Sequence, residues 1–97
     1  MQLVLLDHFA SCVGSGFEIE LGASAMTLTL AEARRLPEAK QPGLRRQPFS
    51  LMFRSSSQVV LPQKLYSLRN AALGQLAIFL VPVARDRQGI VYQAIFN

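Results

Sequence analysis

The chain has 97 residues, of which 51% are apolar, and a formal net charge of +4, which together predict a single domain, residues 1–97, with its own core. Its one cysteine, Cys12, excludes an internal disulfide and a multi-cysteine metal site and favours only weakly the reducing cytoplasm. The first residues lack a basic segment, and the longest uncharged stretch, 71–84, is shorter than the roughly 18 residues of a membrane helix. We therefore expect a soluble, cytoplasmic protein with no secretion signal and no membrane contact.

The first predicted element is a short helix over residues 5–13. Its apolar side chains recur at the three- and four-residue spacing of one helical stripe: Leu5, Leu6, Phe9, Cys12 and Val13. Gly14 and Gly16 follow directly, as is typical beyond a helix C-terminus. Without these glycines, a strand starting at Gln2 would compete with the helix.

Residues 17–21 and 26–30 predict the two strands of an antiparallel hairpin. Apolar side chains alternate with glutamates in the first segment and with threonines in the second. Residues 22–24 provide the turn between them, so we expect the apolar side chains of both strands to point into one core.

The end of this hairpin has two interpretations. Thr29 and Glu32 have the spacing of a capping box, and the good helix formers between residues 31 and 36 stop at Pro37. We expect the strand to end near Leu30 and one helical turn to follow it.

Basic residues concentrate in the next segment, residues 34–46, which is rich in proline and glycine. Five of the ten basic residues of the chain lie there: Arg34, Arg35, Lys40, Arg45 and Arg46. They predict either a solvated surface loop or a contact for an anion such as nucleic acid. Because no aromatic residue lies between Leu36 and Pro48, the segment lacks the stacking groups that single-strand binders use.

The second half of the chain predicts strands over residues 49–54 and 65–68 and a final hairpin of residues 76–81 and 90–96. Both strands of that hairpin are apolar at nearly every position, so we expect both of their faces to be covered. Pro82 cannot donate to a ladder and is expected at a strand end, a bulge or an edge.

Taken together, these elements predict a mainly β domain of the α+β class. Six or seven short strands separated by turns, with one short N-terminal helix, are typical of a small antiparallel β-barrel or sandwich. The sequence contains no internal repeat and no low-complexity segment that would indicate a second unit.

The residues that could carry chemistry do not form a convincing group. His8 and Cys12 share a helix face, which suits a thiolate–imidazole pair, but Cys12 belongs to the apolar stripe and is expected to be structural. Glu18 and Glu20 share one strand face and are expected to be solvated. The glycines around Ser15 follow a helix, whereas a phosphate loop precedes one. We predict no catalytic, metal-binding or cofactor-binding residue, and hence no enzyme and no cofactor.

The surface offers the remaining candidates for function. An apolar patch that the barrel does not cover would indicate a partner. The residues we expect in such a protein interface are Met52, Val59, Val60 and Leu61, with Ile90 and Ile95 as further candidates. A ligand pocket inside the barrel, lined by Tyr66 and Tyr92, is a third interpretation, although a barrel of so few strands is normally filled by its own side chains.

Several short segments spread over the whole chain carry a resemblance to a known group of domains. They are Phe9, Val13-Gly14, Phe17, Pro48–Leu51, Phe53-Arg54, Tyr66, Leu73-Gly74, Ile78–Val83, Gly89, Tyr92, Ala94 and Phe96-Asn97. In these the chain resembles a family of small, uncharacterised bacterial domains that are often encoded near tail-collar-like proteins of phage origin. The chain departs from that pattern at Ser55–Ser57, where a glycine is expected after Arg54. The resemblance implies no active-site residue.

These observations favour a non-catalytic structural or adaptor module that binds another protein or a second copy of itself. The resemblance suggests a phage-tail-derived assembly as its setting. The alternative is nucleic-acid binding through the basic segment 34–46.

Overall fold

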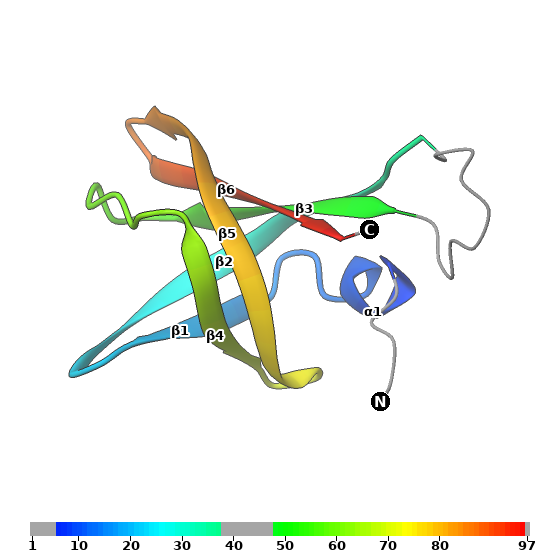
Figure 1. Cartoon of the computed structure of the whole chain (residues 1–97), viewed down its shortest axis with the longest axis horizontal. Helices are drawn as coiled ribbons and strands as arrows, with labels where there is room; N and C mark the ends of the chain where they lie inside the picture. The colour runs from blue at the N-terminus through cyan, green and yellow to red at the C-terminus, as the bar shows by residue number, and fades with distance from the viewer. Residues whose placement is uncertain (1–5, 38–47, 97) are drawn as a thin grey trace.

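The computed structural model describes residues 6–37 and 48–96, which form a closed antiparallel barrel with one short helix (Figure 1). The elements are α1 (Leu6–Ala10), β1 (Gly16–Leu21), β2 (Ser24–Arg35), β3 (Phe49–Ser55), β4 (Lys64–Asn70), β5 (Gly74–Asp86) and β6 (Gly89–Phe96). The strand order around the barrel is β1-β2-β3-β6-β5-β4. The predicted fold class is therefore confirmed as a six-stranded barrel, since the strands close on themselves and do not form two sheets.

The core is built from the alternate side chains that the strands direct inward. Within β1, Phe17 and Ile19 are fully buried while the two glutamates are exposed, as the alternation predicts. The same alternation places Leu51 and Phe53 of β3 in the core. These side chains fill the interior, as expected for a barrel of this size.

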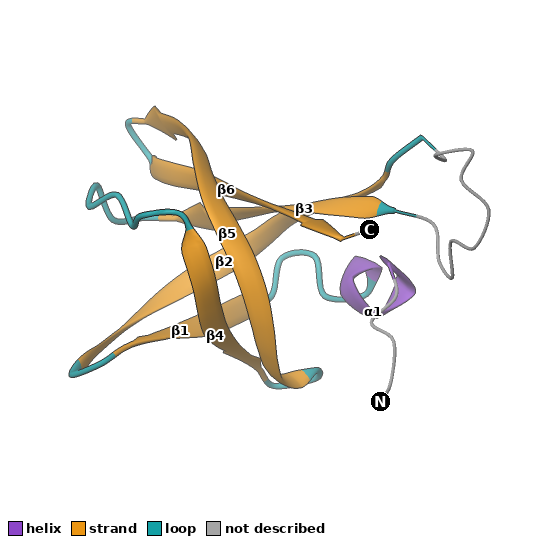
Figure 2. Ribbon diagram, in the orientation of Figure 1, coloured by secondary structure: helices purple, strands orange, loops and turns teal. Residues whose placement is uncertain are grey.

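The helix α1 covers one end of the barrel, close to where β6 ends (Figure 2). Its buried residue Phe9 packs in an aromatic cluster, with ring centroids 5.9 Å from Phe49, 5.5 Å from Phe96 and 6.4 Å from Phe17. Such contacts add to the free energy gained by burying the ring. No helix within residues 6–37 and 48–96 is long and apolar enough to cross a membrane.

The helix is shorter than predicted, and one residue of its expected stripe is misplaced. Val13 is 50% exposed because the helix ends at Ala10 and the chain turns toward β2. The N–H of Gly14 donates to the carbonyl oxygen of Leu30 at 2.8 Å, which fixes this turn. Leu5, the first residue of the stripe, lies outside the described residues.

The helical turn expected after Leu30 is wrong, because β2 continues as a strand to Arg35. The reason is long-range pairing: β3 runs alongside β2 from Leu28↔Ser55 to Arg35↔Phe49. A register shift between Leu30 and Glu32 adds one residue to β2 without ending the ladder. The ladder thus overrides the local preference for a helix.

The expectation that both faces of the last hairpin are covered is also wrong. Ile78 and Leu80 of β5 are buried, but Phe79 between them is 50% exposed, and Ile95 of β6 is exposed as well. The expectation for Pro82 is confirmed, since a register shift between Pro82 and Ala84 places the proline at a bulge.

Candidate functional site

The predicted interface residues lie in different environments. Val59 and Val60 are exposed in the connection between β3 and β4, and Met52 is half-buried on the outer face of β3. Leu61, in contrast, is only 8% exposed and packs in the core, so it does not belong to an exposed surface. The four residues therefore do not form one patch.

Two of the five basic residues fall within the described part of the chain. Arg34 and Arg35 are exposed at the end of β2 and not on a loop. The guanidinium of Arg34 binds the carboxylate of Glu32 at 2.8 Å, which offsets part of its charge. The remaining candidates, Lys40, Arg45 and Arg46, lie outside the described residues. Nucleic-acid binding through this group stays a prediction, which a gel-shift assay at low salt checks.

Cys12, which we expected to be structural, is buried beside Asn70. Its Sγ lies 3.9 Å from the Asn70 Oδ1, and the thiol donates to this oxygen. Within the described residues, no group of three or more histidine, cysteine, aspartate or glutamate side chains could hold a metal ion.

The carboxylate of Glu18 lies 3.7 Å from the guanidinium of Arg69 on the neighbouring strand β4. This ion pair is exposed and crosses the line along which β1 and β4 close the barrel. An ion pair between strands suits a structural role for Glu18.

Both tyrosines of the chain bind the connection between β3 and β4, which we call the plug loop (residues 56–63). The hydroxyl of buried Tyr92 accepts a hydrogen bond from the N–H of Leu61 at 3.0 Å, and the hydroxyl of Tyr66 donates to the carbonyl oxygen of Pro62 at 2.6 Å. These bonds hold the Leu61 side chain in the core. The tyrosines thus serve the fold, and the residues proposed to line an internal ligand pocket fill that space themselves.

Burial raises the pKa of Tyr66 above its ordinary value of 10.0, and the charge of ionised Tyr92 raises it further. The folded protein therefore keeps this proton to higher pH than the unfolded chain does. We expect the free energy of unfolding to fall as the pH rises from about 10 toward the raised pKa. The Tyr66→Phe variant should lose about 1 kcal/mol at neutral pH, for the bond to Pro62, and show a flatter decline at alkaline pH.

Urea denaturation of both proteins across the alkaline range measures this difference. Equal slopes of stability against pH in the two proteins would contradict the assignment to Tyr66.

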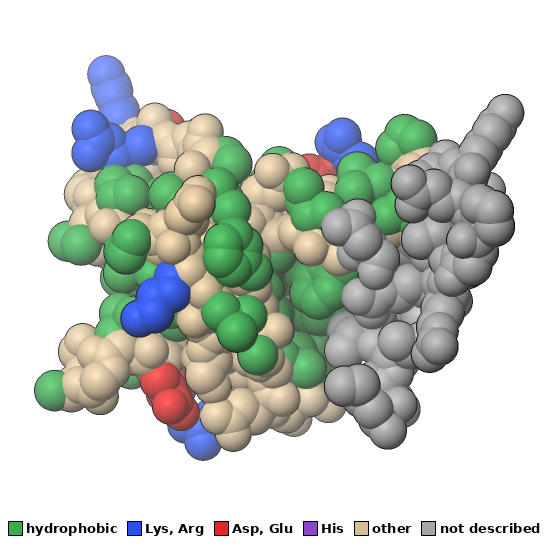
Figure 3. All heavy atoms as spheres, in the orientation of Figure 1, with side chains coloured by type: hydrophobic (Ala, Val, Ile, Leu, Met, Phe, Trp, Pro, Cys, Tyr) green, Lys and Arg blue, Asp and Glu red, His purple; other side chains and the backbone are tan. Residues whose placement is uncertain are grey.

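The outer face of β4 and β5 carries an apolar surface that sequence reasoning missed. Leu65 and Phe79 are directly opposite each other in the ladder, and they are 59% and 50% exposed. Ala77 and Val81 flank Phe79 on the same face of β5. We call these four residues the outer patch. In Figure 3, hydrophobic side chains gather over the middle of the molecule, where β5 crosses it in Figure 1.

Alternation in the sequence contains a signal for this patch. Buried Ile78 and Leu80 put Phe79 on the opposite face, and buried Tyr66 does the same for Leu65. The continuous apolar run over residues 76–81 hid this signal, because such a run is also typical of a strand covered on both sides.

The fold and this surface define a small, six-stranded antiparallel barrel domain that is capped by a helix and exposes apolar residues on one hairpin. The chain belongs to the family described as a domain of unknown function (DUF6916), whose model matches residues 4–96. The expectation of a small, uncharacterised domain family is thereby confirmed. Neither curated proteins nor solved structures gave a match.

Proposed function

We propose that this domain is a non-catalytic structural or adaptor module that binds another protein, or a second copy of itself, through the outer patch. One observation carries the proposal: Leu65 and Phe79 form an exposed cross-strand pair within a regular ladder, next to its last pair. Apolar side chains that touch one another on a sheet surface are typical of contact surfaces, whereas scattered ones are not.

The surroundings of this pair also support a docking role. Ala77 and Ser67, the next ladder partners, are small, so the ring of Phe79 stands above its neighbours on this side. The amide of Gln75 donates to the Ser67 hydroxyl at 2.8 Å and gives the outer patch a polar border. An aromatic centre with a polar border is the usual composition of a protein interface.

The resemblance found in the sequence suggests where such a partner would occur. We propose that the domain belongs to a bacterial assembly derived from a phage tail, in which it joins other components.

The double variant Leu65→Ser/Phe79→Ser tests the proposal. We expect the wild-type protein either to self-associate with rising concentration or to retain a partner from its native source, and the variant to lose that binding. Stability should change by no more than about 0.5 kcal/mol per site, because both side chains are largely solvated. Light scattering behind a sizing column and affinity purification are the measurements.

The variant Val59→Ser is the matched control, because Val59 is 65% exposed but lies on the plug loop and is not part of the outer patch. It should bind as the wild-type protein does. A wild-type protein that stays monomeric and retains no partner would refute the proposal, as would a double variant that binds unchanged.

A further inference from the structure

The barrel is closed by an unusually short pairing between β1 and β4. These strands pair only at Glu18↔Arg69 and Ile19↔Leu68. On their other sides both strands are paired along their whole length, β1 with β2 and β4 with β5. Beyond Ile19 and Leu68, therefore, β1 and β4 each present an edge without a neighbouring strand.

The geometry of β1 explains why it does not complete the seam. The strand ends at Leu21, and the chain turns back into β2 at Gly22, which adopts a φ of 73°. The tip of the β1–β2 hairpin projects away from the barrel (Figure 1). As a result, residues 64–67 of β4 have no strand beside them on the β1 side.

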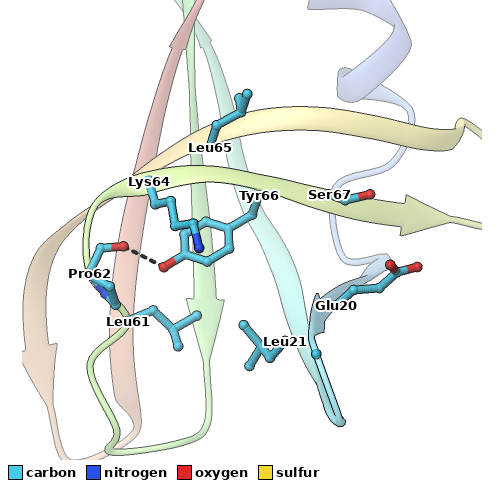
Figure 4. A pocket seen from close by; sticks show the side chains of 9 residues that line it. Glu20, Leu21, Leu61, Pro62, Lys64, Leu65, Tyr66 and Ser67 are labelled. Carbon is cyan, nitrogen blue, oxygen red and sulfur yellow. Dashed lines mark hydrogen bonds between the residues drawn. The ribbon is translucent and has the colours of Figure 1, made fainter.

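A pocket of about 350 Å³ lies where the two strands separate. Its walls come from the end of β1, from the plug loop and from β4; the lining residues are Glu20, Leu21, Gly22, Leu61, Pro62 and 64–67. In Figure 4, the side chains of Leu21 and Leu61 point toward each other below the ring of Tyr66. The pocket thus has an apolar floor next to a free strand edge.

Opposite charges lie at the two ends of this edge. The Lys64 ammonium lies 5.8 Å from the centre of the Tyr66 ring, at the start of β4. Glu20 lines the pocket from the end of β1, on the side of Ser67. The ion pairs among the described residues involve neither Glu20 nor Lys64. Both charges are available to a ligand.

We propose that the free edge of β4 from Lys64 to Ser67 binds an extended peptide segment of another protein as an added strand. Backbone N–H and C=O groups along an open edge are best satisfied by another extended backbone. This inference rests on the proposed function as a protein-binding module. It adds the edge of β4 as a second binding surface, next to the outer patch, and names an extended peptide as the partner that binds there.

The ladder register defines the residues of the peptide. In an antiparallel pairing, which all strands of this barrel use, the peptide runs from Ser67 toward Lys64. The residue opposite Ser67 points outward toward Glu20 and should be basic. The next residue points inward above Leu21 and Tyr66 and should be apolar. The residue opposite Lys64 again points inward and should be acidic. The motif is therefore basic–apolar–any–acidic.

The test uses two blocked peptides, acetyl-TRVTET-amide, which has the motif, and acetyl-TEVTRT-amide, in which the charges are exchanged. Each is titrated to millimolar concentration into the isotope-labelled protein, and backbone amide shifts are followed by NMR. We expect the first peptide to shift the amides of residues 64–67 and to bind about fivefold more tightly than the second.

The doubly exchanged protein Glu20→Lys/Lys64→Glu should reverse this preference, a gain of binding that a folding defect cannot produce. The proposal is overturned if the amides of residues 64–67 do not shift, if both peptides bind equally, or if the exchanged protein keeps the original preference. Because Phe79 does not line this pocket, the single variant Phe79→Ser reports on the proposed function separately. If neither peptide binds while the outer patch still mediates association, this inference is refuted and the proposed function is not.

Discussion

The variant Gly89→Ala is expected to lower the free energy of unfolding by about 4 kcal/mol or more. Gly89 begins β6 with a φ of 130°, a conformation that residues with a side chain rarely adopt. An alanine Cβ at this position would overlap the backbone oxygen of Ser55 at the end of β3. Neither strand can move aside easily, because Ser55 pairs with Ile90 in the same ladder. Urea denaturation followed by circular dichroism measures the loss.

The variant Gly22→Ala separates this overlap from backbone strain alone. Gly22 also has a positive φ, of 73°, but a Cβ there would meet no heavy atom within 4 Å. Its replacement should cost only about 1–2 kcal/mol, the usual penalty of a left-handed backbone. Equal losses in the two variants would show that β3 yields to the added methyl group, against the expectation.

Part of this fold could be predicted from the sequence because three of its six strand pairings join strands that follow one another in the chain across a short turn. β1 pairs with β2 and β5 pairs with β6 across turns of a few residues, and alternation of apolar side chains reveals each strand. The predictions of secondary structure fail where pairing with another strand, and not the local preference of the residues, determines the conformation. Residues 31–35 have a local preference for a helix, and only the pairing with β3 makes them a strand.

The candidate sites were less predictable, because they depend on which strand edges stay unpaired and which strand faces stay uncovered. Nothing in the composition of β4 indicates that its ladder with β1 stops at Leu68, leaving an open edge. The outer patch is a similar case. The exposure of Phe79 depends on whether another element covers β5, and no local pattern encodes that.

Asn70 illustrates a structural role that sequence patterns also conceal. It ends β4 and is 3% exposed, yet its side-chain amide is fully hydrogen-bonded. Its Oδ1 accepts from the N–H groups of Ala72 and Leu73 at 2.8 and 3.0 Å, which orders the turn into β5. Its Nδ2 donates to the carbonyl oxygen of Gly16 at 3.0 Å. One side chain thus ties the β4–β5 turn to the start of β1, next to the short seam that closes the barrel.

The variant Asn70→Ala is expected to lower the free energy of unfolding by about 3 kcal/mol, because it removes several hydrogen bonds of one buried side chain and leaves their part-buried partners unpaired. The matched control is Gln75→Ala, which removes an exposed amide that donates to Ser67. That change should alter stability by no more than about 0.5 kcal/mol. Urea denaturation of both variants is the measurement, and hydrogen exchange should show faster exchange at Ala72 and Leu73 in Asn70→Ala alone. If the two variants lose the same stability, the buried amide contributes no more than a solvated one, and the short β1–β4 pairing must hold the barrel closed without it.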